Sequence, residues 1–465
     1  MLTGIFQFPP RLRQLESAGC SKNPVDNWVS GLPILEWGGI AFTKTTENRP
    51  SDSVFAGERT KAGDRADVSG YTWEIMTIIT DSDALADFCA PLHDEPYITV
   101  DTEFMREKTY WPILCLVQIG GPDDAVAIDP LADGIDLTPM YDLFDNEKVI
   151  KVFHAARQDL EIFLHLGGRL PVPVFDTQVA AMVCGFGESV GYEQLVAKLA
   201  NARLDKGSRF TDWAMRPLSD RQVTYALADV THLRVAYEKL RDRLERENRT
   251  AWIEEEMEVL RAPATYQPDP AEVYKRIKGR KGNGKFLAVL RELAAWRERE
   301  AQRRDVPRNR VVRDETLTEI AHHTPANADA LSRTRGLGAK AAQGPMGSAI
   351  LAAVKTGLDV PKAEWPAPPM RPDLPRGIGP IADLIKVLLK KVSEDTNVAG
   401  RLIASSADVD LIAGLGDKAD VAALRGWRRE IFGDDALRLR SGELALSIDG
   451  NRLVVRDLAP PRAAE

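Results

Sequence analysis

Two carboxylates at the end of a short apolar segment constrain this chain more than any other feature. The segment Tyr97 to Val100 is typical of a β-strand, and Asp101 and Glu103 follow it directly. On a strand, side chains two positions apart point to the same face, so these two carboxylates lie close together. Neighbouring carboxylates repel each other unless a cation lies between them, which favours a divalent metal ion bound through oxygen.

The same pair also arises by chance, because 69 of the 465 residues are acidic. A second segment strengthens the metal-site interpretation. The sequence H-A-A-R-Q-D, from His154 to Asp159, follows the apolar segment Val149 to Phe153 and opens a helical pattern that ends near Gly167 and Gly168. A glycine pair is a common helix end, so Asp159 is expected early on a helix that leaves the carboxyl end of a strand.

A third segment lies in a long helix predicted to begin after Ser219. Ser219 and Gln222 form the pattern of a capping box. Apolar residues then recur at helical spacing from 223 to 244. Tyr225 and Asp229 lie one turn apart beside this apolar stripe, so their side chains face the same direction. The three segments together supply four acids and one tyrosine as candidate site residues.

D-T-E-F at 101–104, H-A-A-R-Q-D at 154–159 and Y-A-L-A-D at 225–229 resemble the three exonuclease motifs of the DEDD superfamily, tyrosine subclass. Within it, the sequence is most similar to the bacterial ribonuclease D family, over roughly residues 76–260. Further matching segments are L-V-Q-I-G at 116–120, V-F-D-T at 174–177 and D-W-A-M-R-P-L-S at 212–219. The resemblance implies a ribonuclease-H-like α/β domain, in which helices flank a mixed sheet.

The resemblance also implies a role for each candidate residue. Asp101 would bridge two divalent cations, Mg²⁺ or Mn²⁺. Glu103 and Asp229 would complete the first cation site, and Asp159 would hold the second through water. Two cations about 4 Å apart can activate a water molecule and neutralise the leaving oxygen of a phosphodiester. An ordinary phenol titrates at about 10, so Tyr225 is expected to orient the attacking water rather than to take its proton.

Other residues near the motifs have two alternative roles. His154 either contacts the scissile phosphate or terminal sugar, or donates a structural hydrogen bond. Phe104 either stacks on the terminal base or belongs to the core, and the resemblance favours stacking. Asp176 precedes a helical segment and is expected to cap it rather than to be a fifth site acid. Trp213 and Arg216 are expected to be structural anchors.

The remaining pattern alternates short apolar segments with helical ones in the exonuclease region. Strands are predicted at 78–79, 97–102, 114–119, 125–129, 149–153 and 173–175. Residues 271–361 are predicted to be helical and resemble the helicase-and-RNase-D C-terminal (HRDC) domain, a small all-α bundle. Proline-rich linkers flank this region. The expected domains are a disordered N-terminal extension at 1–75, the exonuclease domain at 76–262, the HRDC domain at 271–361 and a second, diverged HRDC-like bundle at 375–455.

The N-terminal extension is expected to be either a mis-assigned translation start or a dispensable segment. Its residues mix proline, glycine, serine and charge without sustained periodicity. Four cysteines without a C-x-x-C pair favour a reducing, cytoplasmic compartment. No apolar run is long enough to cross a membrane. We therefore expect neither a membrane partner nor a required protein partner.

Positive charge is concentrated in one stretch of the helical region. Lys275 to Arg313 holds 14 Lys or Arg against 4 Asp or Glu, a net charge of +10 in a chain of net charge −8. Such a stretch can contact phosphates, and Lys278, Arg280 and Lys281 are the candidate contacts. The alternative is a solvated helix face with paired charges, such as 297–300. The same stretch resembles a nucleotide-binding loop at 279–285, but phenylalanine follows where serine or threonine is required, which excludes an ATPase.

The expected function is a metal-dependent 3′→5′ exoribonuclease. By resemblance, it trims the 3′ ends of structured RNA such as transfer-RNA precursors and releases nucleoside 5′-monophosphates. One alternative is a DNA 3′→5′ exonuclease of the proofreading type, although no polymerase region follows the exonuclease motifs. The other is a catalytically inactive RNA-binding adaptor, although no metal-ligating residue of the motifs is missing.

Overall fold

The computed structural model describes residues 66–68, 71–73, 77–204, 207, 211–368 and 374–458. The expectation of a disordered extension at 1–75 therefore falls mostly outside the described residues. Within that extension, β1 (Ala66–Val68) and β2 (Tyr71–Trp73) pair as antiparallel strands. Among the described residues, no helix is long and apolar enough to cross a membrane. Cys89, Cys115 and Cys184 are buried free thiols, whereas Cys20 lies outside the described residues.

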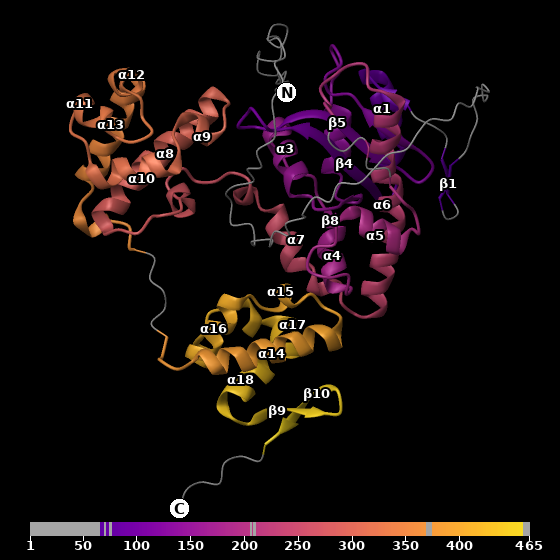
Figure 1. The fold of residues 1–465 in the computed structure, drawn as a ribbon. Helices are drawn as coiled ribbons and strands as arrows, with labels where there is room; N and C mark the ends of the chain where they lie inside the picture. The colour runs from indigo at the N-terminus through magenta and orange to yellow at the C-terminus, as the bar shows by residue number, and fades with distance from the viewer. Residues whose placement is uncertain are drawn as a thin grey trace, which may run out of the picture. The chain divides into compact units, whose positions relative to one another are not determined.

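A six-stranded mixed sheet forms the centre of the exonuclease region, as the sequence predicts (Figure 1). The strand order is β3-β6-β5-β4-β7-β8. The interior strand β4 is antiparallel to β5 and parallel to β7. The strand bounds are β3 (Thr77–Ile79), β4 (Tyr97–Met105), β5 (Ile113–Gly120), β6 (Ala125–Ile128), β7 (Ile150–Phe153) and β8 (Val174–Asp176).

Helices cover both faces of this sheet. One apolar cluster joins the sheet to the three helices that precede β8, and a second joins it to the long helix α6. Two predicted helix ends are confirmed: α3 ends at Gly168 with φ +70, and α6 begins with a capping box between Ser219 and Gln222. The helix bounds are α1 (Ser82–Leu92), α2 (Thr138–Asp145), α3 (Arg157–Gly167), α4 (Thr177–Val183), α5 (Tyr192–Leu199), α6 (Asp220–Arg246), η2 (Thr250–Trp252), α7 (Glu254–Arg261) and η3 (Pro263–Thr265).

The next region is a helical bundle with its own apolar core, as predicted. Leu287, Leu293, Leu317 and Ile350 are fully buried in that core. Asn283 caps α8 where the sequence resembles a nucleotide-binding loop, and a 3₁₀ helix precedes this turn instead of a strand. The bounds are η4 (Val273–Arg276), α8 (Gly284–Arg304), α9 (Arg308–Val311), α10 (Asp314–His323), α11 (Ala328–Ser332), α12 (Ala339–Gln343), α13 (Pro345–Asp359) and η5 (Lys362–Glu364).

The C-terminal region is mostly helical but ends in a β-hairpin. The helical expectation, which extends to residue 455, is wrong from residue 444 onward, where β9 and β10 pair as antiparallel strands. The reason is a tight turn: Asp449 pairs with Arg452, and Gly450 between them has φ +57, a conformation that glycine adopts readily. The bounds are α14 (Gly379–Thr396), α15 (Gly400–Ile403), α16 (Ser406–Leu415), η6 (Gly416–Lys418), η7 (Ala422–Leu424), α17 (Gly426–Arg428), η8 (Arg429–Gly433), α18 (Asp434–Ser441), β9 (Leu444–Asp449) and β10 (Arg452–Asp457).

Candidate active site

Strand β4 presents its acidic pair towards helix α6. The Thr99 hydroxyl donates a hydrogen bond to the main-chain oxygen of Val230 in α6, at 2.9 Å. Asp101 and Glu103 follow Thr99 at spacings of two and four, so their side chains leave the same face of the strand. A bulge between Glu103 and Phe104 then interrupts the pairing of β4 with β5. Both carboxylates therefore lie beneath α6, next to the bulge that interrupts the pairing of β4 with β5.

Helix α6 adds a third carboxylate. One carboxylate oxygen from each of Asp101, Glu103 and Asp229 lies within 4.8 Å of the other two. Asp101 and Asp229 are 128 positions apart in the chain. The structure thus brings together three of the four acids that the sequence indicates, and their oxygen atoms are the donors that Mg²⁺ and Mn²⁺ prefer.

The fourth acid, Asp159, comes from the first turn of α3 and is held differently. The Thr102 hydroxyl donates a hydrogen bond to its carboxylate. Burial raises the pKa of Asp159 to about 7, and the Thr102 hydrogen bond opposes part of that shift. Asp159 is not part of the group of three oxygens, but its charge acts on Asp101.

Electrostatic repulsion makes this cluster a candidate cation site. Burial raises the pKa of Asp101 well above its ordinary value, and the carboxylates of Asp229, Asp159 and Glu103 raise it further. A carboxyl group whose pKa is raised by neighbouring carboxylates is stabilised in its ionised form when a cation neutralises the cluster. The donor set therefore fits divalent metal ions bound through oxygen.

Tyr225 lies one helical turn before Asp229 and is half-buried. Its ring lies 6.1 Å from the buried ring of Trp213, centroid to centroid. A pocket of about 320 Å³ opens beside Tyr225, which is one of its lining residues. The other lining residues are Arg203, Leu204, Arg221, Thr224, Ala228 and His232. The predicted tyrosine thus borders a basic pocket on the helix that carries Asp229.

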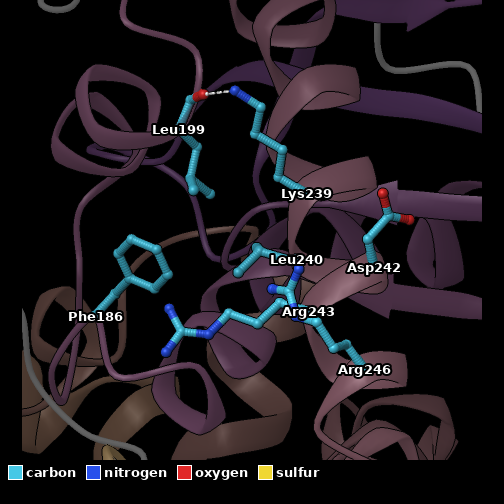
Figure 2. A pocket seen from close by; sticks show the side chains of 7 residues that line it. All are labelled: Phe186, Leu199, Lys239, Leu240, Asp242, Arg243 and Arg246. Carbon is cyan, nitrogen blue, oxygen red and sulfur yellow. Dashed lines mark hydrogen bonds between the residues drawn. The ribbon is translucent and has the colours of Figure 1, made fainter.

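A second pocket, of about 290 Å³, lies farther along α6 (Figure 2). Its first lining residue on the helix is Lys239, which donates a hydrogen bond to the Leu199 main-chain oxygen. At 1.5 Å per residue, Lys239 is roughly 15 Å along the helix from Asp229. Asp242 is the one acid among its lining residues, so this pocket lacks a cluster of several carboxylates that could bind metal ions.

Asp176 caps α4, as predicted, by accepting a hydrogen bond from the Gln178 main-chain N–H at 2.8 Å. Its two oxygens also accept hydrogen bonds from the main-chain N–H groups of Ala155 and Ala156, at 3.0 and 2.9 Å. Ala155 has φ +60, a conformation that alanine rarely adopts. Asp176 therefore fixes the turn that leads from His154 into α3, and thereby the start of the helix that carries Asp159.

His154 and Phe104 both have structural contacts. The His154 Nδ1 lies 3.0 Å from the Thr177 hydroxyl oxygen, and burial lowers the pKa of the ring. Its buried Nε2 has no hydrogen-bond partner within the described part of the chain. Phe104 is partly buried and packs against the main apolar cluster. Arg216 anchors the segment before α6, because its guanidinium pairs with Asp129.

Sequence reasoning missed Tyr192. Its hydroxyl donates a hydrogen bond to the main-chain oxygen of Asp229, at 2.5 Å, and its ring lies 5.4 Å from that of His154. Tyr192 thus links the start of α5 to the site helix and to the second motif. No local pattern around position 192 indicates this role, because the contact depends on the packing of two helices.

The basic candidates lie apart from this cluster in the chain. Lys278, Arg280 and Lys281 occupy the turn between η4 and α8, where both lysines are exposed and Arg280 donates to the Ile277 main-chain oxygen. The alternative of a solvated, paired helix face is wrong for Arg297 and Glu298, which are 5% and 1% exposed.

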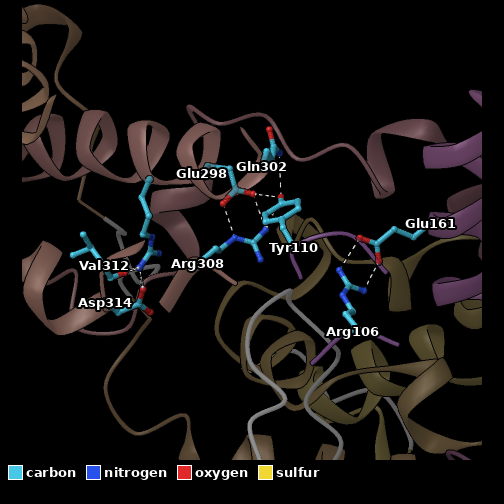
Figure 3. Close-up of polar contacts among 9 residues, drawn as sticks. Arg106, Tyr110, Glu161, Glu298, Gln302, Arg308, Val312 and Asp314 are labelled. Atoms are coloured by element: carbon cyan, nitrogen blue, oxygen red, sulfur yellow. Dashed lines mark hydrogen bonds and ion pairs between the residues drawn. The ribbon is translucent and has the colours of Figure 1, made fainter. Parts of the chain in front are cut away.

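Glu298 instead belongs to a buried network between α8 and the connection that follows β4 (Figure 3). Tyr110 donates a hydrogen bond to Glu298, and Arg308 pairs with the same carboxylate at 2.6 Å. Arg106, in the same connection, forms two hydrogen bonds with Glu161 of α3, at 2.6 and 2.8 Å. The connection that leaves the acidic strand is thus held by α3 and by α8.

Comparisons with known proteins agree with this arrangement. A family model described as "3'-5' exonuclease" matches residues 76–245, and one described as "HRDC domain" matches residues 286–354. Ribonuclease D of Granulibacter bethesdensis is 52% identical over 378 residues, which cover 81% of this chain and 95% of that protein. Ribonuclease D of Acidiphilium cryptum is 51% identical over 381 residues, covering 82% and 97%.

One solved structure is similar over most of its length. It is the crystal structure of Escherichia coli RNase D, described as an exoribonuclease involved in structured RNA processing. The TM-score is 0.70 at 31% sequence identity, and the match covers 79% of this chain and 99% of that one.

Proposed function

The chain belongs to the ribonuclease D family of 3′→5′ exoribonucleases, and on that premise we propose that it hydrolyses RNA with two divalent cations held by its four motif acids. The observation that carries this proposal is the convergence of Asp101, Glu103 and Asp229, whose oxygens lie within 4.8 Å of one another. Asp159 supplies the remaining ligand from α3, and its charge already acts on Asp101. Both Mg²⁺ and Mn²⁺ fit an oxygen-only donor set.

The side chains around the acids have separate tasks in the reaction. Divalent cations held by the four acids would lower the pKa of a bound water and neutralise the charge on the 3′ oxygen that leaves. The attacking oxygen forms the new bond to phosphorus as the bond to that 3′ oxygen breaks, which releases a nucleoside 5′-monophosphate. The Tyr225 hydroxyl orients the attacking water. Thr102 holds Asp159 in place, and Tyr192 holds the main chain of α6 at Asp229.

We propose structured RNA with a free 3′ end as the substrate, and transfer-RNA precursors as its natural class. The processing of structured RNA by the similar E. coli enzyme supports this choice. The net charge of +10 between Lys275 and Arg313 supports it independently, because RNA affinity depends on phosphate contacts. Lys278, Arg280 and Lys281 are the proposed phosphate contacts. His154 and Phe104 are the proposed contacts of the terminal nucleotide.

We propose that three domains contribute to this function. We also propose that the protein is cytoplasmic. The proposed exonuclease domain spans 76–262, the HRDC domain 271–361 and a second HRDC-like domain 375–455. The separate apolar core of the bundle and the two family matches support the first boundary. The cytoplasmic location rests on the cysteine usage alone.

The decisive experiment is digestion of a 3′-extended transfer RNA by three purified proteins. Wild type should shorten it from the 3′ end, and Asp101→Ala should be almost inactive because it loses a proposed metal ligand. Tyr225→Phe removes one hydroxyl, so we expect roughly a tenfold to hundredfold lower rate, the range for one hydrogen bond to a charged group. Chromatography of the products should identify nucleoside 5′-monophosphates.

Two controls separate the alternatives. A DNA oligonucleotide of matched sequence should be digested more slowly than the RNA, and equal or faster digestion would favour a DNA exonuclease. Ca²⁺ in place of Mg²⁺ should abolish hydrolysis while RNA binding persists. Full activity of Asp101→Ala would refute the proposed site, and RNA binding by an inactive wild type would favour an adaptor.

A further inference from the structure

Gln118 is a buried polar side chain that the proposed reaction does not use. It lies in the middle of β5 and is 0% exposed. Neither its Nε2 nor its Oε1 has a hydrogen-bond partner among the residues that the structure describes. Buried amides are almost always hydrogen-bonded, so an unpartnered one requires an explanation.

The sheet register places this amide beside the metal site. Gln118 pairs directly with Asp101 across the antiparallel strands β5 and β4. Residues paired in this way point to the same face, with their Cβ atoms about 5 Å apart. On its other side, Gln118 pairs with Ala127 of β6. The side chain of Gln118 therefore lies between a small apolar residue and the proposed bridging carboxylate, on the sheet face that α6 covers.

The rest of that surface is mostly apolar. Leu116, Ala127, Ala226 and Val230 belong to the apolar cluster between the sheet and α6. The neighbouring polar side chain on this face, Thr99, already donates to Gly120 and Val230 main-chain oxygens. The carboxylate of Asp101 is thus the acceptor that the register brings nearest to the Gln118 amide.

We propose that Gln118 is a positioning residue for the metal site, whose Nε2 donates a hydrogen bond to the Asp101 carboxylate when the divalent cations are bound. This inference rests on the proposed function of the four acids. A donor behind a bridging carboxylate fixes the direction of its lone pairs and so raises metal affinity. Partners of this kind, one layer behind the ligands, typically contribute tenfold to hundredfold in metal affinity or activity.

A structural role predicts a different behaviour. If Gln118 served only to fill the space beneath α6, its amide would matter for folding and not for metal binding. If it positions Asp101, the unpartnered buried amide destabilises the metal-free protein. It gains a hydrogen bond only when metal binds. The two roles therefore predict opposite effects on metal-free stability.

The test uses the full chain, Mn²⁺ and no RNA. Gln118→Met keeps most of the side-chain volume and removes the amide. We expect calorimetry to show Mn²⁺ affinity weakened roughly tenfold to hundredfold. We also expect metal-free Gln118→Met to unfold at the same urea concentration as wild type or at a higher one, and to gain less thermal stability from Mn²⁺. Gln118→Leu repeats the test with a different shape.

Thr99→Val is the matched control. Thr99 is buried on the same face, two positions before Asp101, but it bonds α6 rather than the site acids. It should lower stability and change Mn²⁺ affinity much less than the Gln118 variants do. Wild-type Mn²⁺ affinity in both Gln118 variants, or metal-free variants that no longer fold, would overturn the inference. Equal Mn²⁺ binding by wild type and Asp101→Ala would instead overturn the proposed metal site.

Discussion

Asp159 is a site acid whose protonation changes with pH near neutrality. Burial raises its pKa to about 7 from the ordinary value of 3.8. The folded, metal-free protein therefore keeps a proton on Asp159 in a pH range in which the unfolded chain has lost it. A group with a raised folded-state pKa stabilises the fold fully at low pH, and this stabilisation is lost as the pH rises from about 4 to about 7.

At the residue scale, we predict that metal and protons compete at Asp159. Mn²⁺ affinity should fall below about pH 7 by up to tenfold per pH unit, because a binding cation must displace the proton. Over the same interval, urea unfolding in the presence of a chelator should show metal-free stability decreasing as pH rises. Asp159→Asn lacks the titrating proton, so both pH dependences should become shallower. Identical pH profiles in Asp159→Asn and wild type would contradict this prediction.

The sequence predicts a site residue well when its role depends on neighbouring positions in the chain. It predicts poorly those residues whose role depends on the packing of distant elements. The alternation of β4 and the one-turn spacing in α6 are local, so Asp101, Glu103 and Asp229 were predictable candidates. Their spatial convergence was implied by the family resemblance and not by spacing. The contacts of Tyr192 and Gln118 depend on which helix and which strand pack beside them. No pattern in one sequence encodes such pairings.

Elements with explicit end signals were predicted best. The capping box at Ser219 and the left-handed Gly168 define their helices through local hydrogen bonds, so the sequence indicates them directly. The hairpin β9–β10 was missed because its strands are short, and a short apolar segment fits a helix or a strand equally well. Gly450 was a local signal, since a glycine in a tight turn favours a hairpin.

The turn between η4 and α8 gives a prediction at the element scale. Reversing the charges of Lys278, Arg280 and Lys281 to glutamate should weaken binding of a structured RNA. It should also make the slope of log affinity against log salt less steep by roughly two, because each phosphate that the protein no longer neutralises reduces the slope by about 0.7. Hydrolysis of a short oligonucleotide should be nearly unchanged, because the metal site is intact. Filter binding at several salt concentrations measures the slope.

The control variant makes the same change in net charge at three lysines outside the turn. Lys340, Lys355 and Lys362 are exposed in the same helical region, outside the basic stretch. Reversing these three lysines should weaken RNA binding much less. Equal effects of the two triple variants would show that overall charge, rather than the turn, governs binding.

At the scale of the whole molecule, aromatic residues tie the regions of the chain together. Tyr110, from the connection after β4, is 6% exposed and belongs to the apolar core of the helical bundle. The main-chain N–H groups of Tyr110 and Trp111 both donate to Asp305 at the end of α8. In the C-terminal region, Trp427 stacks on Trp252 with ring centroids 4.6 Å apart.

We predict that Tyr110 couples the unfolding of the exonuclease region to that of the bundle. Tyr110→Ala should cost about 3–5 kcal/mol and split a single urea transition into two, because it removes a buried aromatic contact. Tyr110→Phe should cost about 1–3 kcal/mol, since Glu298 loses one hydrogen-bond donor and keeps Arg308. Fluorescence and circular dichroism should then give different midpoints, because the transition is no longer two-state.

Tyr141→Phe provides the comparison for Tyr110→Phe. The Tyr141 hydroxyl is buried and has no hydrogen-bond partner in the part of the chain that the structure describes. Its removal should be neutral or slightly stabilising. Coincident unfolding transitions in Tyr110→Ala would show that the two regions are coupled by other contacts.

The position of Tyr110 also limits how this protein can be divided. A fragment that ends at residue 262 would keep all four site acids, yet it would uncover Tyr110 and the part of Trp111 that packs against the bundle. Paired exposed aromatics favour self-association, so such a truncated nuclease should precipitate or form oligomers even with its chemistry intact. A rearranged protein, whether it arises by recombination or in the laboratory, should therefore stay soluble only when it contains both the nuclease and the bundle that covers those rings.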